Sequence, residues 1–416
     1  MKAYIILTYT ITGLGGSIVY VRNKINYVKT LGYHPFVFYC IKQSDIYIKE
    51  LLDFSDNLIE DFLIPITIYN EKDRNRVLDK FIKSIGICNS DSIIESHFST
   101  ASYWGEFLSE RLSIKHIVFL LQEKFETIGG EDVKFFKFKY DRSELAGIVD
   151  KSIPILFSGF YSNIETRCLT AYCTNVVEDI CCPKEYYVKE EDVFCIGTIG
   201  RIDKKFVLPI MERISKFTQR YPEHKFVVLC IGGSSVESNK EEILLKLFES
   251  YDNVKCLITG LIYPIPYSMI TQMDLFISTA GSAHISYKYG IPTISIDALS
   301  FEAIGILGYT TSSILYRGDE NVKTLEEYIE DVFVGKYKKK VVEYENYCFD
   351  FSSHLKFIED GVSEKDYFSF AIQNKSIFEM TKRNFKLYIK KRIGFSAYNK
   401  ILNECKKLKK NINIKF

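Results

Sequence analysis

The residues best suited to chemistry follow apolar, strand-like runs in the second half of the chain. Arg201, Lys204 and Lys205 come directly after the run "FCIGTIG". Several cations at the mouth of a sheet are costly to hold together unless an anion lies between them. A guanidinium offers a forked pair of donors and an ammonium a point charge, so a diphosphate would satisfy both. The alternative is a solvated basic turn.

Glycines follow the neighbouring apolar runs. Gly232 and Gly233 come after "FVVLCI" and make a flexible, donor-rich turn. Gly260 comes after "VKCLIT" and is followed by Leu261 and Ile262, where an open strand end can meet a planar base. Each glycine alone is equally an ordinary turn, but ligand-compatible residues at several strand ends favour a binding site.

A fourth run, "DLFIS", ends in the small residues Ala280, Gly281 and Ser282. Small residues let backbone N–H groups approach a ligand closely, and we expect Ser282 to cap the next helix, whose positive end then faces an anion. Ala283 and His284 continue this candidate donor-binding turn. An ordinary strand-to-helix turn is the alternative.

The first half offers a glycine loop and one histidine. The loop "TGLGGS", with Gly15 and Gly16, is an incomplete dinucleotide fingerprint, and no acid follows the next strand where an NAD ribose would need one. His97, in "IIESHFST", is our candidate general base or acceptor-binding residue. Glu95 and Glu123 are further candidate acceptor-binding residues. A structural histidine is the alternative. No D-x-D motif stands out at a strand end, so we expect no cofactor and no obligatory metal.

Strands and helices alternate in both halves, which predicts an α/β fold with doubly wound parallel sheets. The expected domains are residues 1–185, residues 186–365 and a basic helical tail, 366–416. In such sheets ligands bind beyond the carboxyl ends of the strands, where the turns above lie. The elements that we expect are strands beginning at Ala3, Pro35, Ser92, Lys115, Ile153, Val193, Lys225, Val254, Asp274 and Pro292, and helices over 206–220 and 241–251.

The length and the composition of the chain agree with two packed domains. The chain has 416 residues, a hydrophobic share of 47% and a net charge of +1, which gives no argument for nucleic-acid binding. Eleven cysteines without a disulfide pattern indicate a reducing, cytoplasmic setting. No run is long enough to span a membrane. Residues 381–416 hold twelve Lys or Arg and one acid, so this tail can lie on an anionic membrane surface or simply be solvated.

In this arrangement the chain resembles the GT-B glycosyltransferases, particularly the bacterial group that builds surface polysaccharides from nucleotide sugars. The matching stretches are "GLGGSIVYVRNKINYVKTLGYHPFVF", "IGTIGRIDKKFVLPIMERISKFTQRYPEHKFVVLCIGG", and "VKCLITGLI" through "DLFISTAGSAHISYKYGIPTISI". The resemblance implies two Rossmann-like domains facing each other across a cleft, with the donor nucleotide on the second and the acceptor mainly on the first. It also implies catalytic or diphosphate-holding roles for Arg201 and Lys205, and donor contacts for the first-domain glycine loop and for the turn at Gly281 and Ser282. Gly200, which begins the turn "GRIDKK", is a further candidate donor-binding residue.

One departure from the family pattern is that "STAGSAHISYKYGIP" contains no acid, whereas retaining members carry two glutamates here. Either other donors hold the sugar, such as His284 or backbone N–H groups, or the stereochemistry has changed, or the protein does not turn over. From the resemblance we expect a cytoplasmic transferase that uses a glycan or lipid-linked acceptor at the inner membrane face. A non-catalytic GT-B-like partner subunit and a nucleotide-sugar epimerase are the alternatives.

Overall fold

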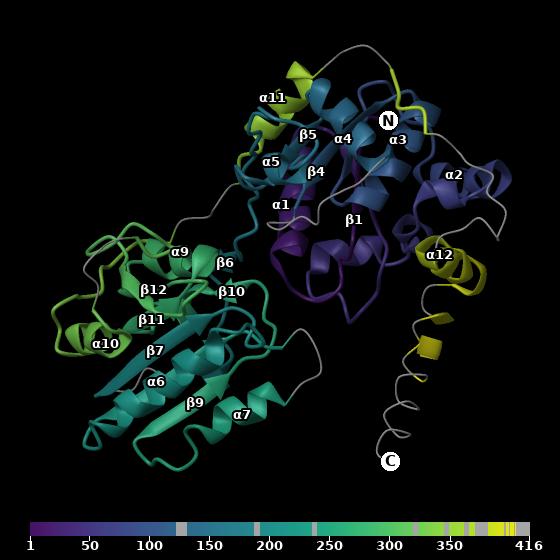
Figure 1. The fold of residues 1–416 in the computed structure, drawn as a ribbon. Helices are drawn as coiled ribbons and strands as arrows, with labels where there is room; N and C mark the ends of the chain where they lie inside the picture. Colours follow the sequence, from purple (N-terminus) through teal and green to yellow (C-terminus); the bar gives the residue numbers. More distant parts are fainter. Residues whose placement is uncertain are drawn as a thin grey trace. The chain divides into compact units, whose positions relative to one another are not determined.

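The computed structural model describes residues 1–121, 131–186, 192–234, 239–318, 323–344, 349–361, 366–370, 382–394, 397–398, 400–402 and 404. The chain forms two compact units, shown in Figure 1. The first comprises Met1–Thr12, Tyr20–Tyr172 and Phe349–Phe416. The second comprises Gly13–Val19 and Cys173–Cys348.

The first unit is built on a five-stranded parallel sheet in the order β2-β1-β3-β4-β5. All six residues of the interior strand β1 are buried, because helices cover the sheet. The strands are β1 Ala3–Thr8, β2 His34–Tyr39, β3 Ile93–Ser96, β4 Lys115–Leu120 and β5 Leu145–Gly147. The helices are α1 Gly16–Thr30, α2 Glu71–Ile85, α3 Ser99–Leu112, α4 Glu131–Asp141, α5 Ser152–Leu156, α11 Ser352–Asp360 and α12 Lys382–Ile393, with the 3-10 helices η1 Lys49–Phe54, η2 Glu60–Leu63 and η3 Ile66–Ile68.

The second unit has a six-stranded sheet in the order β13-β12-β11-β7-β8-β9, and a separate pair, β10-β6. Its strands are β6 Val177–Glu178, β7 Val193–Ile199, β8 Lys225–Ile231, β9 Val254–Ile258, β10 Ile265–Pro266, β11 Leu275–Ser278, β12 Thr293–Ile296 and β13 Ala303–Ile306. Its helices are α6 Val207–Gln219, α7 Lys240–Lys246, α8 Tyr267–Thr271, α9 Ala280–Lys288 and α10 Leu325–Phe333, with the 3-10 helix η4 Lys184–Tyr186.

Local signals explain several element ends. The side chain of Asn70 caps α2 by accepting a hydrogen bond from the backbone N–H of Asp73 at 2.8 Å, and Gly86, at φ +77°, ends that helix. Thr324 and Glu327 form a reciprocal capping box at the start of α10. These caps satisfy backbone groups that helix ends leave without intrahelical partners.

Two expectations about the elements are wrong. The run from Ile153 is the short helix α5, not a strand. Its buried residues Ile153 and Leu156 are three apart, which is helical spacing, and Pro154 is tolerated in a first turn because its missing N–H has no intrahelical partner there. The second sheet is also not wholly parallel, since β13 follows β12 without an intervening helix and pairs with it antiparallel.

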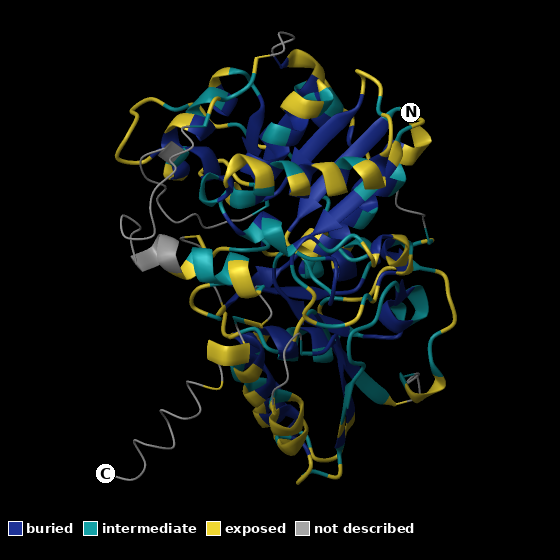
Figure 2. Cartoon of the chain, turned by 90° about the vertical axis from the view of Figure 1, so that its right-hand side faces the viewer, coloured by how far each residue is buried: buried dark blue, intermediate teal, exposed yellow. Residues whose placement is uncertain are grey.

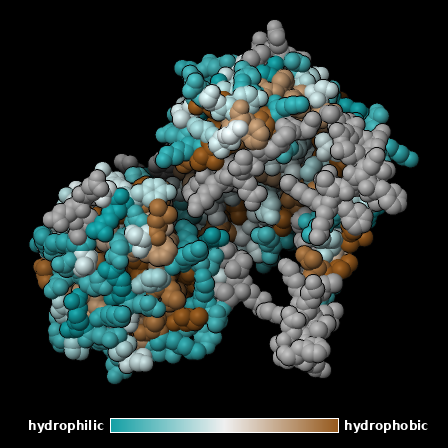
Figure 3. Space-filling view, in the orientation of Figure 1, coloured by the Kyte–Doolittle hydropathy of each residue, from teal (hydrophilic) through white to brown (hydrophobic). Residues whose placement is uncertain are grey.

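Burial follows the layers. Figure 2 shows most strands in dark blue and the outward faces of the helices in yellow, whereas the edge strand β9 is mostly of intermediate burial. Hydrophilic side chains cover most of the second unit in the view of Figure 3, with hydrophobic ones scattered between them. Across the described ranges no helix is long and apolar enough to cross a bilayer.

Candidate functional site

The carboxyl ends of four neighbouring strands, β11, β7, β8 and β9, form one rim of the second sheet. These strands are parallel, so the turns that follow them lie at the same edge. The turns are hydrogen-bonded to one another. The N–H of Gly200 donates to the carbonyl of Ile231 at 3.0 Å, and the N–H of Gly232 donates to the hydroxyl of Thr259 at 3.0 Å. The turns that sequence reasoning selected therefore lie beside one another.

Two of the predicted glycines are required by close backbone approach. A Cβ on Gly232 would lie 2.0 Å from the carbonyl oxygen of Gly200, and the φ of Gly232 is +146°. A Cβ on Gly233 would lie 3.0 Å from the backbone of Gly260. The backbones of three turns thus pack directly on one another, which leaves little freedom in the position of their N–H and C=O groups.

The three cations of the turn that follows β7 occupy different positions near the end of that strand. The Cβ position of Gly200 lies 3.9 Å from the ammonium of Lys204 and 3.8 Å from the hydroxyl of Ser282. Lys204 and the head of α9 therefore meet beside the end of β7. Arg201 has a side chain 44% exposed and lies next in the chain to Gly200, while Lys205 is exposed. The structure brings Lys204, rather than Lys205, to the centre of the rim.

The start of α9 differs from the expected cap. The cap residue is Thr279, and its side chain makes no capping hydrogen bond. Ser282 is already inside the first helical turn, so the prediction that it caps α9 is wrong. The N–H of Ala280 instead donates to the carbonyl of Ile314 at 2.6 Å. The side chain of Thr279 thus leaves the first turn uncapped, and the N–H groups after Ala280 point toward the helix N-terminus, where an anion is favoured.

Other predicted donor residues lie around this turn. Ala283 is buried, so only its backbone can serve a ligand, and His284 is exposed. Ile262 is half-buried beyond β9.

The glycine loop of residues 13–19 belongs to the second unit and meets the segment that follows Tyr172. A Cβ on Gly16 would lie 3.3 Å from the Cβ of Cys173, whereas Gly15 has open space around it. A Cβ on Gly281 would lie 3.5 Å from the hydroxyl of Thr174. Cys173 and Thr174 therefore connect two predicted site turns. Sequence reasoning missed Thr174, because it lies in an irregular segment with no motif around it.

In the first unit, His97 and Glu95 form a buried pair at the end of β3. The Nε2 of His97 lies 2.9 Å from Glu95 Oε1, and the two side chains are 3% and 0% exposed. Tyr20 donates to the same carboxylate at 2.7 Å, and the ammonium of Lys24 lies 3.5 Å from it. Burial by itself would raise the pKa of Glu95, but Lys24 and His97 outweigh it and lower that pKa. Glu95 is thus an ionised carboxylate inside the protein.

This carboxylate sets the tautomer of His97. A carboxylate only accepts, so Nε2 of His97 donates, and in the neutral ring Nδ1 carries the lone pair. His354 of α11 is held in the same way, since its Nε2 donates to the carbonyl of Thr170 at 2.9 Å. The Nδ1 atoms of both histidines and the ammonium of Lys24 are buried without a hydrogen-bond partner among the residues described. Burial and nearby Lys24 lower the pKa of His354 to about 4.

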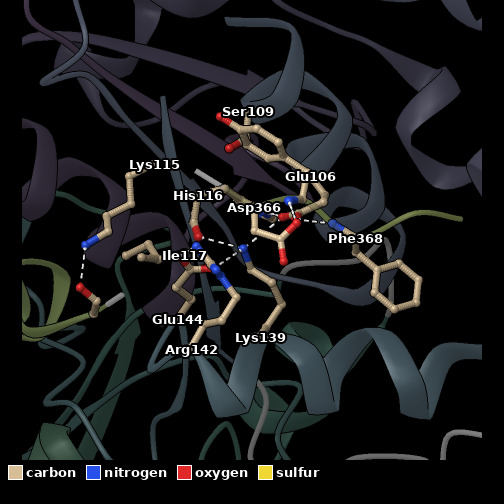
Figure 4. Close-up of polar contacts among 12 residues, drawn as sticks. Glu106, Ser109, Lys115, His116, Ile117, Lys139, Arg142, Glu144, Asp366 and Phe368 are labelled. Carbon is tan, nitrogen blue, oxygen red and sulfur yellow. Dashed lines mark hydrogen bonds and ion pairs between the residues drawn. The ribbon is translucent and has the colours of Figure 1, made fainter. Parts of the chain in front are cut away.

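A second buried network is centred on Glu106, His116 and Lys139, and its polar contacts are drawn in Figure 4. Ser96 Oγ lies 2.7 Å from Nε2 of His116, whose Nδ1 lies 2.8 Å from Glu106. These contacts have the order of a hydrolase triad, but Ser96 is 0% exposed, and Phe368 donates its backbone N–H to Glu106 at 3.0 Å. No substrate can reach this serine, so the network is structural. Glu123 lies outside the described residues.

Solved structures are similar to this chain at low sequence identity. No family model matches the sequence, and no curated protein matches it either. A glycosyltransferase structure from Rickettsia africae ESF-5 has a TM-score of 0.54 and 14% identity, over 80% of this chain and 89% of that one. Sucrose-phosphate synthase from Thermosynechococcus elongatus has a TM-score of 0.47 and 13% identity, over 80% and 90%. The N-terminal domain of trehalose-6-phosphate phosphatase from Candida albicans has a TM-score of 0.41 and 12% identity, over 86% and 92%.

The sheet orders and the likeness to the Rickettsia structure show the fold. The predicted fold class is confirmed: the chain is an α/β protein with the two Rossmann-like domains of the GT-B fold.

Proposed function

We propose that this protein is a glycosyltransferase that moves a sugar from a nucleotide-sugar donor to a glycan or lipid-linked oligosaccharide. The observation that carries the proposal is the meeting of Gly200, Lys204 and Ser282 at the carboxyl edge of the second sheet. In such a transfer, negative charge grows on the leaving diphosphate. Groups that bind this charge more strongly in the transition state than in the ground state accelerate the reaction.

The rim supplies such groups from separate elements. Lys204 and Arg201 are the cations that we assign to the diphosphate, with Lys205 nearby in the chain. The hydroxyl of Ser282 and the N–H groups of the first turn of α9 after Ala280 add uncharged donors. The open end of β9, at Gly260 and Ile262, is our proposed contact for the nucleotide base.

On the acceptor side we assign the general base to His97, whose Nδ1 is buried in this structure, so the assignment requires that an acceptor hydroxyl reaches this atom in the complex. Glu95 holds Nε2 as the donor, so the lone pair for a hydroxyl proton lies on Nδ1. Glu95 is a positioning residue in this scheme, because its carboxylate is fully buried and is already bound by Tyr20 and Lys24.

Thermal-shift titration with nucleotides tests the donor site. With ligand at one hundred times its Kd, binding adds about 2.7 kcal/mol of stability, a rise of ~5 °C or more in the melting temperature of the second unit. We expect UDP, GDP or CMP, or one of their sugars, to produce this shift in the wild type. Arg201→Ala and Lys204→Ala should reduce it by more than half. Arg220→Ala is the matched control, because Arg220 is exposed at the far end of α6.

A non-catalytic partner subunit is the second candidate function. It is favoured by the absence of acids from residues 278–292 and by the burial of His97 and Glu95. The same titration separates the two candidates. Absence of stabilisation by every nucleotide, or an equal response in Arg201→Ala and Arg220→Ala, would refute the transferase proposal and favour the partner.

A further inference from the structure

The second unit contains a cavity at the edge of its sheet opposite to the rim. Its floor is formed by the amino ends of β11, β7 and β8, and its wall by the end of α10 and the turn that follows. Its volume is about 370 Å³, within the usual range for small-ligand sites. It is lined by Asp192, Val193, Phe194, His224, Lys225, Asp274, Val332, Phe333, Gly335, Tyr337, Lys338 and Lys339.

Aromatic side chains that pack against one another form the wall of this cavity. Phe333 packs edge-to-face on Phe194 with ring centroids 5.2 Å apart, and on His224 at 5.1 Å. Tyr337 packs against Tyr309 at 5.0 Å. The rings are held in place by one another, so they offer a preformed apolar surface. Such a surface can accept the C–H face of a sugar ring at low entropic cost.

The charged groups at its mouth are mainly basic. Lys225 and Lys338 are exposed, and neither forms an ion pair with any residue that the structure describes. The ammonium of Lys339 donates to the carbonyl of Thr271, which leaves its charge in place. Asp274 accepts a hydrogen bond from the backbone N–H of Cys195 at 2.8 Å. The three lysines outnumber the two lining carboxylates, so the mouth attracts an anion.

We propose that this cavity is a second glycan site that binds acidic oligosaccharide, with sugar rings on the aromatic wall and carboxylate or phosphate substituents on Lys225 and Lys338. The proposal rests on the proposed function and deepens it, because it names an acidic polymer as the acceptor class. A second site on the same chain raises the effective concentration of a long acceptor without new contacts at the first. It would favour long acceptors over short ones.

Isothermal titration of the full chain tests this site directly. The probes are hexagalacturonate, neutral maltohexaose of the same length and inorganic phosphate. We expect the wild type to bind hexagalacturonate more tightly than either other probe, with affinity falling as salt rises. The double variant Lys225→Glu/Lys338→Glu should bind it at least tenfold more weakly. Lys340→Glu, which makes half of that charge change in the same lysine run but outside the cavity, should stay within twofold.

Arg201→Ala separates this site from the proposed donor site at the rim. This variant should bind hexagalacturonate with the wild-type affinity, whether or not the protein binds a nucleotide. Four results would overturn the proposal: equal binding of maltohexaose, equal binding of phosphate, an equal loss in Lys340→Glu, or a loss in Arg201→Ala. Melting temperatures of all variants are measured alongside. A variant that loses binding while it melts at the wild-type temperature has lost the site and not the fold.

Discussion

Replacement of Lys139 by methionine probes the buried charges behind β3 and β4. The ammonium of Lys139 donates to Glu106 at 2.8 Å, to Glu144 at 2.6 Å and to the carbonyl of His116 at 2.9 Å, and its side chain is 2% exposed. Methionine keeps most of the stem but no charge, so two buried carboxylates lose their shared partner. Removing one member of a buried ion pair typically costs 3–5 kcal/mol, and we expect about 4 kcal/mol here.

The same substitution should change the dependence of stability on pH. Burial would raise the pKa of Glu106, but Lys139 and His116 together lower it from 4.5 to about 2. A lowered folded-state pKa stabilises the fold above pH 4.5, and this stability is lost as the pH falls toward 2. The difference corresponds to about 3 kcal/mol. Without Lys139 the pKa of Glu106 should rise, so the acid transition should begin at a higher pH.

Urea unfolding followed by tryptophan fluorescence is the assay, because the single tryptophan, Trp104, is buried in α3 of the first unit. The matched control is Lys137→Met in the same helix, whose ammonium pairs with the more exposed Asp141. It should cost less than about 1 kcal/mol. If the two substitutions cost the same, or if Lys139→Met costs under about 1 kcal/mol, the buried-pair reasoning is refuted.

Three further predictions follow from other parts of the molecule. Gly232→Ala places a Cβ 2.0 Å from the carbonyl oxygen of Gly200 and should abolish thermal stabilisation by nucleotides. A wild-type shift in melting temperature would show that nucleotide binding tolerates displacement of these turns. Glu95→Gln leaves Lys24 charged and buried and should cost about 3 kcal/mol in urea unfolding, and adding Lys24→Met should restore part of it, whereas strict additivity would contradict the coupling. A smaller fraction of Lys386→Glu/Arg392→Glu than of the wild type should sediment with anionic vesicles, since both side chains are exposed on α12. An unchanged fraction would show that these two residues do not bind the membrane.

The basic tail shows how a charge pattern can contain both structural and exposed groups. On α12, Lys391 pairs with Asp73 at 2.7 Å and lies 4.3 Å above the ring of Tyr69, so this lysine holds the helix on the first unit. Burial and neighbouring Lys386 lower the pKa of Lys390. The sequence alone presents all these lysines alike, because it carries no record of which carboxylate lies opposite. Only the remaining exposed groups are available to a membrane, and that role stays a proposal.

The rim was predictable from sequence, whereas the buried charges were not. Apolar runs that end in glycine mark the carboxyl ends of parallel strands, and topology then brings Gly200, Gly232 and Gly260 together. Glu95 and Glu106 are different, because a lone acid next to an apolar run normally indicates a solvated position. Their partners come from distant segments, as Lys139 and the backbone of Phe368 do for Glu106. No local pattern encodes such pairs.

The charges of the proposed donor site determine which part of the donor should carry the binding energy. Lys204 and Arg201 stand near the end of β7, while the stretch through α9 contains no acid to hold sugar hydroxyls. Charge-assisted bonds to a diphosphate are stronger than bonds between neutral groups, so the sugar should add little. We therefore expect a nucleoside diphosphate to bind within about tenfold of its nucleotide sugar, a difference of about 1.4 kcal/mol, and a monophosphate to bind far more weakly. Calorimetric titration of the three ligands measures this. Tight binding of the monophosphate would place recognition on the base and refute the diphosphate assignment.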